Sequence, residues 1–416
     1  MAVSPPEAPP ENADADTEMT DVSSSDSSFS DGQDRRLGGF FTPPVNWPGP
    51  HPDDSFTYDE LIHFGAIDLP RGEPVSFGDL HGPIHPILHH SRWFGMTVTD
   101  HENILPALRL VTNMLEAPHV LAFFYMVCFS PRTPLPAVTA KYGVPCTQIP
   151  APTEGVSPSG IRLIKQYLVD AASLLFFAFG TPSNEDGATF RFLTVRSSLG
   201  GTGALMRLHY RLYAALVPGR NWAFEQLLRC QLFLATTILH ELAHAMNCTA
   251  QPIPPDVDPA TMRSAEPFVG ADRQAELGRA LEQVFFGGVV DQYAADRDST
   301  FGLVVQRWPD LGSAHEYWPN GDVQTPERRA AGTFTTVYLV PMTYVKAVHT
   351  QLFWRRVQRF GASETRVKKT VGRRRWNQRE ASGDGVGSDE SSLNREASSE
   401  GRVGGRLMAA SEVGSP

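Results

Sequence analysis

The sequence predicts an α-rich domain of the mixed α/β (α+β) class, with one long helix, a small sheet and a disordered tail at each end. Neither proline nor glycine occurs between Trp222 and Cys248, where Leu, Ala, Gln, Glu and Arg dominate. This composition favours a helix of about seven turns, and Asn221 is placed to cap its start. The segment TFRFLTVRSSLGG (189–201) is rich in Phe, Thr and Val and ends like a turn, so it predicts a strand.

The composition of the two ends predicts the tails. Residues 1–36 contain nine acidic side chains and only two basic ones, among runs of Pro, Ser and Asp, and residues 361–416 are rich in Ser, Gly, Glu and Arg. Such segments bury too little apolar surface to offset the entropy lost on ordering. We therefore expect one domain over residues 37–360, an acidic tail before it and a basic tail after it.

Charge, cysteine usage and apolar runs exclude several classes of protein. The net charge of −10 comes partly from the acidic N-terminus and predicts no nucleic-acid-binding surface. The four cysteines show no CxxC spacing, which indicates reduced thiols, and no secretory signal is visible at the start. The apolar runs 119–130 and 168–180 are shorter than the ~20 residues that span a bilayer. We expect an intracellular protein, cytoplasmic or nuclear, without a membrane partner.

The most informative motif lies within the predicted long helix. In His240-Glu241-Leu242-Ala243-His244, the two histidines are one turn apart and about 40° apart around the helix, so both imidazoles can reach one ion. Neutral imidazoles bind zinc and leave its charge largely uncompensated, which acidifies a bound water. Glu241 lies beside them, where it can accept a proton from that water. The alternative is a pair of core histidines and a buried glutamate, each with its own partner.

The motif and three later segments resemble a known family. ILHELAHAMN is similar to the active-site helix of zincin metallopeptidases, and EPFVG (266–270), AELGRALEQVFFGG (275–288) and YLVPMTYV (338–345) resemble uncharacterised fungal zincin-like proteins. The similarity extends over residues 185–355. It implies a zincin-like domain that hydrolyses a peptide or protein substrate with Glu241 as general base. The Gly and His that would extend the motif in metzincins are missing after His244.

The resemblance to gluzincins implies a third zinc ligand from a second helix downstream. The candidates are Glu266, Glu276 and Glu282, and residues 272–286 predict a helix. On this helix Glu276 and Glu282 are roughly 240° apart, so they cannot both face one ion. We prefer Glu276, because the gluzincin ligand lies early in its helix, and leave the other two as alternatives.

Two more roles follow from the resemblance. In zincins an edge strand lies above the metal and pairs with an extended substrate, a role that the predicted strand 189–201 would take, with an ordinary core strand as the alternative. Tyr344 would donate a hydrogen bond to the oxyanion of a tetrahedral intermediate, with core packing as the alternative. Met342 is expected to be a core residue.

Two other clusters carry weaker signals. His81, His85, His89 and His90 lie close together, but Pro83 and Pro86 interrupt any helix that would align them, so we expect a surface loop. Cys248 follows His244 by one turn and is expected to be a buried thiol.

Residues 366–379 hold seven basic side chains and no acidic one, which is typical of a nuclear import signal, an anion-binding tail or a solvated tail. This segment is the exception to our expectation that nucleic acid is not a partner. Two alternatives to an active peptidase stay open: a non-catalytic zinc-binding protein with a decayed site, and a SprT-like nuclear protease that acts near DNA.

Overall fold

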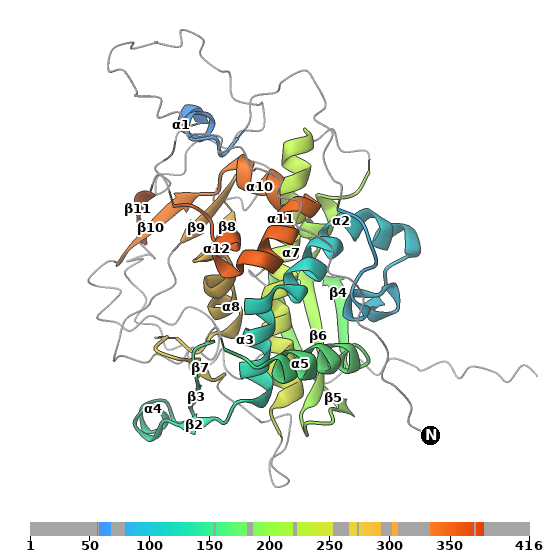
Figure 1. Ribbon diagram of the computed structural model, residues 1–416, viewed down its shortest axis with the longest axis vertical. Helices are drawn as coiled ribbons and strands as arrows, with labels where there is room; N and C mark the ends of the chain where they lie inside the picture. The colour runs from blue at the N-terminus through green and yellow to red at the C-terminus, as the bar shows by residue number, and fades with distance from the viewer. Residues whose placement is uncertain are drawn as a thin grey trace, which may run out of the picture. The chain divides into compact units, whose positions relative to one another are not determined.

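A computed structural model of the chain describes Phe56 and residues 58–67, 80–152, 155–180, 186–218, 223–252, 266–272, 274–292, 302–306, 333–369 and 372–377. Every described residue belongs to one unit, Pro43–Pro416. The predicted acidic tail, residues 1–36, lies outside the described residues. The described part is of mixed α/β class, as predicted, with long helices and small sheets (Figure 1).

The first half of the unit is mainly helical. Its helices are α1 (Tyr58–His63), α2 (Val98–Glu116), α3 (Pro118–Phe129), α4 (Pro136–Tyr142), α5 (Pro158–Ala171) and α6 (Tyr210–Ala214). The apolar run 119–130 forms α3, whereas the run 168–180 divides into the end of α5 and a strand. Within the described residues, no helix taken singly has the length and apolar character to cross a membrane. The pair α2 and α3 meets both criteria, but the pair is bent by 72°.

A four-stranded sheet provides one wall of the core. Its order is β1 (Trp93–Phe94), β4 (Leu175–Gly180), β6 (Thr202–His209) and β5 (Gly187–Arg196). The first three strands are mutually parallel, and β5 pairs with β6 in the antiparallel sense at the end of this order. The predicted strand 189–201 is thus confirmed as β5, with a turn at its end. In the described part of the chain it is an edge strand.

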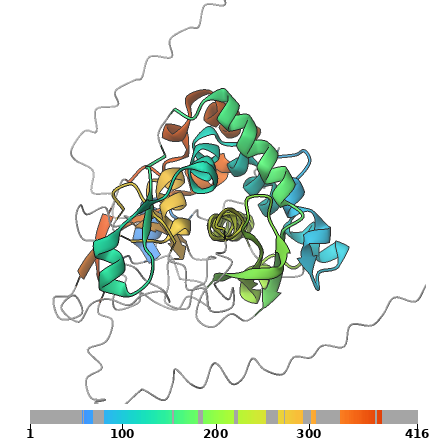
Figure 2. The same cartoon turned by 90° about the horizontal axis from the view of Figure 1, so that it is seen from below.

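The long predicted helix is α7 (Phe224–Ala250), which lies at the centre of the core. Nearly all of its side chains are buried, because β5 and β6 cover one side while α2, α3 and α8 (Leu277–Phe286) cover others. Figure 2 views α7 along its axis, with these elements around it. The helix begins two residues later than predicted, and Ala223 occupies the capping position, where its backbone N–H donates to Gln226. Asn221, the predicted cap, lies outside the described residues.

Two further sheets contain short strands. One is antiparallel throughout, in the order β11 (Gly372–Asn377), β10 (Thr333–Leu339), β9 (Leu303–Gln306) and β8 (Val289–Gln292). The other has the order β2 (Thr133–Pro134), β3 (Thr147–Ile149) and β7 (Phe268–Val269). Through β7 and β8, these sheets position the segments on either side of α8.

The structure contains further elements beyond residue 361, where the C-terminal tail is predicted to begin. After α10 (Met342–Val348) and α11 (Gln351–Phe360), the chain continues into α12 (Ala362–Thr365) and then into β11. Thr365 and Val367 are buried, and the backbone N–H of Val367 donates to the carbonyl of Phe286 at the end of α8. Backbone pairing of β11 with β10 needs little apolar sequence, which is why composition did not reveal it. Residues 378–416 lie outside the described residues.

Candidate metal centre

Helix α7 brings His240 and His244 side by side. Their ring centroids are 4.9 Å apart, and the Nε2 atom of each ring points to the same carboxylate oxygen, Oε1 of Glu276. The distances are 3.1 Å from His240 and 2.9 Å from His244. The structure thus brings together the three residues that the sequence analysis preferred as ligands.

The spacing of these atoms fits a single metal ion. One donor atom from each of the three residues lies within 4.8 Å of the others, and no further His, Cys, Asp or Glu among the described residues joins the group. Tetrahedral zinc with bonds of about 2.0–2.1 Å separates its ligand atoms by about 3.3 Å, close to the observed distances. The two imidazoles are 21% and 19% exposed and Glu276 is 22% exposed, so the donor atoms lie near an opening to solvent.

Glu276 reaches the histidines from the residue before α8, and not from within that helix. The predicted helix 272–286 in fact begins at Leu277, and Glu276 caps it by accepting a hydrogen bond of 2.5 Å from the backbone N–H of Arg279. Its second oxygen faces the imidazoles. The close packing of α8 on α7 requires a glycine here, because a Cβ on Gly278 would lie 2.4 Å from Nε2 of His240.

The two alternative ligands, Glu266 and Glu282, contact the other nitrogen of each imidazole. Nδ1 of His240 donates to Glu282 over 2.7 Å, and Nδ1 of His244 donates to Glu266 over 2.6 Å. A proton on Nδ1 leaves Nε2 free as a metal ligand, and such carboxylate partners fix the orientation of the ring. This role was not predicted for either residue.

Each of these carboxylates is itself held by a backbone N–H. The second oxygen of Glu282 accepts from Val290 over 2.7 Å, and that of Glu266 accepts from Leu277 over 2.9 Å. Glu282 is only 3% exposed, and burial raises its pKa, although its contact with His240 opposes the shift. A buried glutamate needs such partners, because an unpaired carboxylate in the core is costly. No local sequence pattern points to its contact with His240.

The electrostatics of the cluster favour a cation. Burial alone lowers the pKa of His240, but Glu276 and Glu282 outweigh it and raise that pKa to about 10. Glu266 and Glu276 likewise outweigh burial at His244 and raise its pKa well above the usual value. Burial raises the pKa of Glu276, but the two histidines dominate and hold it well below its usual range. The carboxylates thus give the site a strongly negative potential where the Nε2 atoms meet.

Glu241 lies against the edge strand and not among the three donor groups. It is 4% exposed, and its Oε2 accepts a hydrogen bond of 2.6 Å from the hydroxyl of Thr189 on β5. The strand passes so close that a Cβ on Gly187 would lie 2.5 Å from Oε1 of Glu241. Burial raises the pKa of this carboxyl, while the two histidines and Thr189 limit the rise. The contacts with Thr189 and Gly187 were not predicted, and no local pattern in the sequence points to them.

The hydroxyl of Tyr344 contacts backbone near the end of α8. This hydroxyl donates to the carbonyl of Thr365 over 2.6 Å, and Thr365 in turn bonds the carbonyl of Phe285. Phe285 is nine residues beyond Glu276, which corresponds to about 13 Å along α8. This geometry fits the core-packing alternative, and we do not assign Tyr344 a role at the oxyanion. Met342, on the same helix, is a buried core residue as expected.

The remaining candidates do not contribute to the centre. Cys248 is a buried thiol, as expected, and burial raises its pKa. His85 and His89 precede two short 3₁₀ turns and accept hydrogen bonds from backbone N–H groups of those turns, while His90 lies in the second turn and contacts the carbonyl of Met96. None of them belongs to a potential metal-binding group in the described part of the chain.

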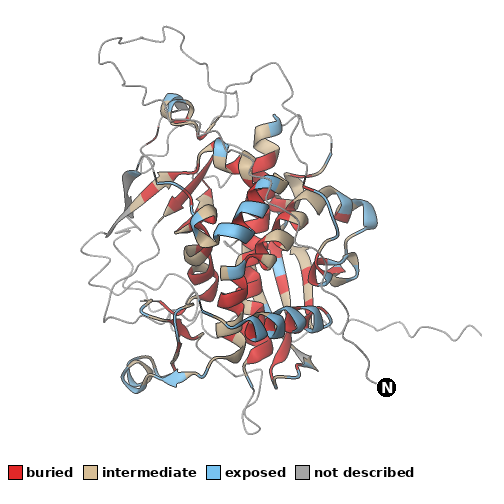
Figure 3. Ribbon diagram, in the orientation of Figure 1, coloured by how far each residue is buried: buried red, intermediate tan, exposed pale blue. Residues whose placement is uncertain are grey.

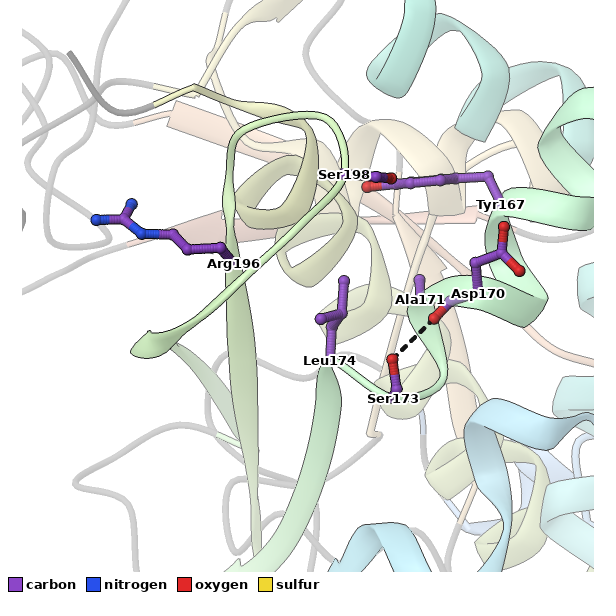
Figure 4. A pocket seen from close by; sticks show the side chains of 7 residues that line it. All are labelled: Tyr167, Asp170, Ala171, Ser173, Leu174, Arg196 and Ser198. Carbon is purple, nitrogen blue, oxygen red and sulfur yellow. Dashed lines mark hydrogen bonds between the residues drawn. The ribbon is translucent and has the colours of Figure 1, made fainter. Parts of the chain in front are cut away.

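The structure also contains a pocket of about 300 Å³ beside the end of α5. Figure 4 shows its lining, in which Arg196 points away from the other side chains. The lining residues are Tyr167, Asp170, Ala171, Ser173, Leu174, Arg196 and Ser198. The hydroxyl of Ser173 donates to the backbone carbonyl of Asp170, and no histidine or cysteine lines the pocket. The histidine cluster is therefore the stronger candidate for a functional site.

Comparison with known proteins adds no assignment. No protein-family model matches the chain, and no curated protein or solved structure shows significant similarity to it. The case for a function therefore rests on the geometry of the cluster.

Proposed function

We propose that the protein is a zinc-dependent peptide hydrolase of zincin type, with His240, His244 and Glu276 as the metal ligands and Glu241 as the general base. One observation carries the proposal. Two Nε2 atoms and one carboxylate oxygen converge at distances suited to one ion, and a buried carboxyl that is not part of this set lies next to them. Three protein ligands with an open side are typical of catalytic zinc sites.

The proposed role of each side chain follows from its contacts. Zinc, when bound, lowers the pKa of a coordinated water from about 16 towards 7 and polarises a carbonyl. Oε2 of Glu241 is occupied by the hydroxyl of Thr189, so Oε1 is the atom that accepts the proton of the attacking water. The raised pKa of Glu241 suits it to hold this proton and to return it to the leaving amine.

The edge strand supports a peptide as the substrate class. Strand β5 ends the sheet order in the described part of the chain, and Gly187 and Thr189 place its start directly beside Glu241. An extended peptide that adds to such an edge forms main-chain hydrogen bonds along its length. Its scissile bond would then lie close to the base and to the two Nε2 atoms.

A non-catalytic zinc-binding protein is the main alternative. A structural zinc site normally closes with a fourth protein ligand, whereas the group found among the described residues has three members, all about one-fifth exposed. This observation favours an open, catalytic type of site.

The test separates metal binding from chemistry. We expect about one zinc per chain by elemental analysis, and His240→Ala and His244→Ala should lose it. Glu241→Gln should keep the zinc and the fold but cleave a peptide library 10²–10⁴-fold more slowly, since general-base catalysis is typically worth that factor. Equal cleavage by wild type and Glu241→Gln would disprove this mechanism. Zinc binding without any cleavage by the wild type would favour the non-catalytic alternative.

A further inference from the structure

Basic residues are concentrated in the last described part of the chain. Between Met342 and Asn377 the sequence contains ten basic residues and a single acidic one, Glu364, although the whole chain has a net charge of −10. The basic run in the sequence, residues 366–379, covers only the later part of this region and lies within the predicted tail. In the structure the region is folded, as α10, α11, α12 and β11.

Helix α11 presents one basic face to solvent. Its apolar face, Phe353, Trp354 and Val357, is buried in the core, whereas Arg355 and Arg359 lie on the opposite face, one turn apart, and are exposed. Figure 3, in the orientation of Figure 1, shows exposed ribbon in pale blue where α11 lies. Neither of these two arginines has an acidic partner among the described residues. Arg356 differs, because Glu364 on α12 pairs with its guanidinium over 2.9 Å and neutralises it.

Further exposed cations follow α12. Arg366 and Lys368 flank the buried Val367, whose backbone N–H bonds the carbonyl of Phe286, so these two side chains extend from an anchored segment. The same segment continues to β11, which carries Arg373, Arg374 and Arg375 in its sequence. Helix α12, which ends directly before Arg366, packs against α11. We call Arg355, Arg359, Arg366 and Lys368 the basic surface.

We propose that the basic surface binds the phosphate backbone of double-stranded nucleic acid, without preference for sequence. The guanidinium groups of arginine and the ammonium group of lysine, held on folded segments, form hydrogen bonds and ion pairs with phosphate oxygens. A single strand would need exposed aromatic rings on which bases can stack. Helix α11 has one exposed ring, Phe360, which already contacts the guanidinium of Arg359 at 5.1 Å from its centroid, and a lone ring cannot stack successive bases.

An anionic membrane fits this surface less well than nucleic acid does. A membrane-binding amphipathic helix inserts its apolar face, but that face of α11 is buried in the protein core. The exposed apolar residues of α11, Leu352 and Phe360, lie at opposite ends of the helix and form no continuous patch. Phosphate groups that contact the arginines from outside require no such insertion.

The test measures binding of the full chain to a fluorescent duplex oligonucleotide of mixed sequence at 50–200 mM salt, a range set by the expected salt dependence. Arg355→Glu/Arg359→Glu should weaken binding about tenfold or more and lower the slope of log K against log salt by about two, since each lost phosphate contact removes about 0.9. Lys141→Glu is the matched control, because Lys141 is exposed on α4, which lies apart from α11 in both views (Figures 1 and 2). It should leave affinity and slope unchanged.

Zinc content and unfolding midpoint show whether each variant is folded, and Arg355→Gln/Arg359→Gln provides a milder second variant. The proposal does not depend on the hydrolase function, since binding is measured without any substrate. It would be overturned by absence of duplex binding at low salt, by equal losses in the Lys141→Glu control, or by unchanged affinity in both arginine variants. Equal competition by polyglutamate or tighter binding to anionic vesicles would also contradict it, and would indicate an acidic protein or a membrane.

Discussion

Gly278→Ala tests the position of His240 with a single added methyl group. The new Cβ would lie 2.4 Å from both Nε2 and Cδ2 of His240, whereas non-bonded atoms prefer about 3.5–4.0 Å. The ring or helix α8 must therefore move by about 1 Å, while metal–ligand bonds tolerate only about 0.2 Å. Zinc affinity should fall by at least about 100-fold, since even the loss of a residue that orients a ligand costs 10–100-fold.

If no clash occurred, Gly278→Ala would instead stabilise α8, so the result distinguishes a clash with His240 from its absence. Alanine is a better helix former than glycine by about 1 kcal/mol, so without a clash the variant would be more stable and would bind zinc normally. The assay is zinc titration against a competing chelator, with thermal unfolding of the zinc-free protein measured in parallel. Gln283→Ala, on the same helix, is the control and should change neither quantity strongly.

Gly187→Ala applies the same perturbation to the base. Its Cβ would lie 2.5 Å from Oε1 of Glu241, so it should displace the carboxylate and leave His240 and His244 in place. We expect zinc binding near the wild-type level and peptide cleavage reduced 10²–10⁴-fold. Wild-type zinc affinity in Gly278→Ala, or zinc loss in Gly187→Ala, would refute the arrangement of ligands and base described above.

Three further predictions test the support of the site and the core. Glu282→Gln and Glu266→Gln should each weaken zinc binding about 10–100-fold, because each removes a charged partner of a ligand histidine, and chelator competition measures this. Burial lowers the pKa of His349 to about 4 against its usual 6.5, so its neutral form stabilises the fold above pH 6.5 and this contribution is lost as the pH falls towards 4. The loss reaches about 3 kcal/mol, and denaturant unfolding of His349→Leu should show a flatter dependence on pH over this interval. Ending the chain after Gly361 removes the buried Val367 and strand β11, so it should lower the free energy of unfolding by several kcal/mol, whereas little change would mean that this segment does not support the core.

Local sequence pattern was sufficient to predict the elements that carry the site. The absence of Pro and Gly predicted both ends of α7 to within two residues. Helical spacing alone placed His240 and His244 on one face of that helix. The strand β5 was predicted by its β-branched and aromatic residues. Glu276 was preferred by analogy, although it precedes its helix instead of lying within it. That these residues bind zinc, and that the chain is zincin-like, remain predictions.

Contacts between distant segments could not be predicted in the same way. Glu266 and Glu282 are 22 and 42 residues from the histidines that they contact, and Thr189 is 52 residues from Glu241. Such pairs are set by how α7, α8 and β5 pack, and helical or strand periodicity contains no information about that packing. Glu276 precedes α8 and meets Nε2 of His240, whereas Glu282 lies within α8 and meets Nδ1 of the same ring.

The supports of the ligands and of the base come from different parts of the fold. The carboxylates that orient His240 and His244 are anchored by backbone groups of β8 and α8, both of which pack directly on α7. Glu241 is instead held by β5, the strand expected to receive the substrate. A shift of β5 on substrate binding would therefore move the base relative to the attacking water while the ligand geometry stayed fixed. In the proposed hydrolase, metal affinity and proton transfer would therefore depend on separate contacts, although His240, Glu241 and His244 share little more than one turn of helix.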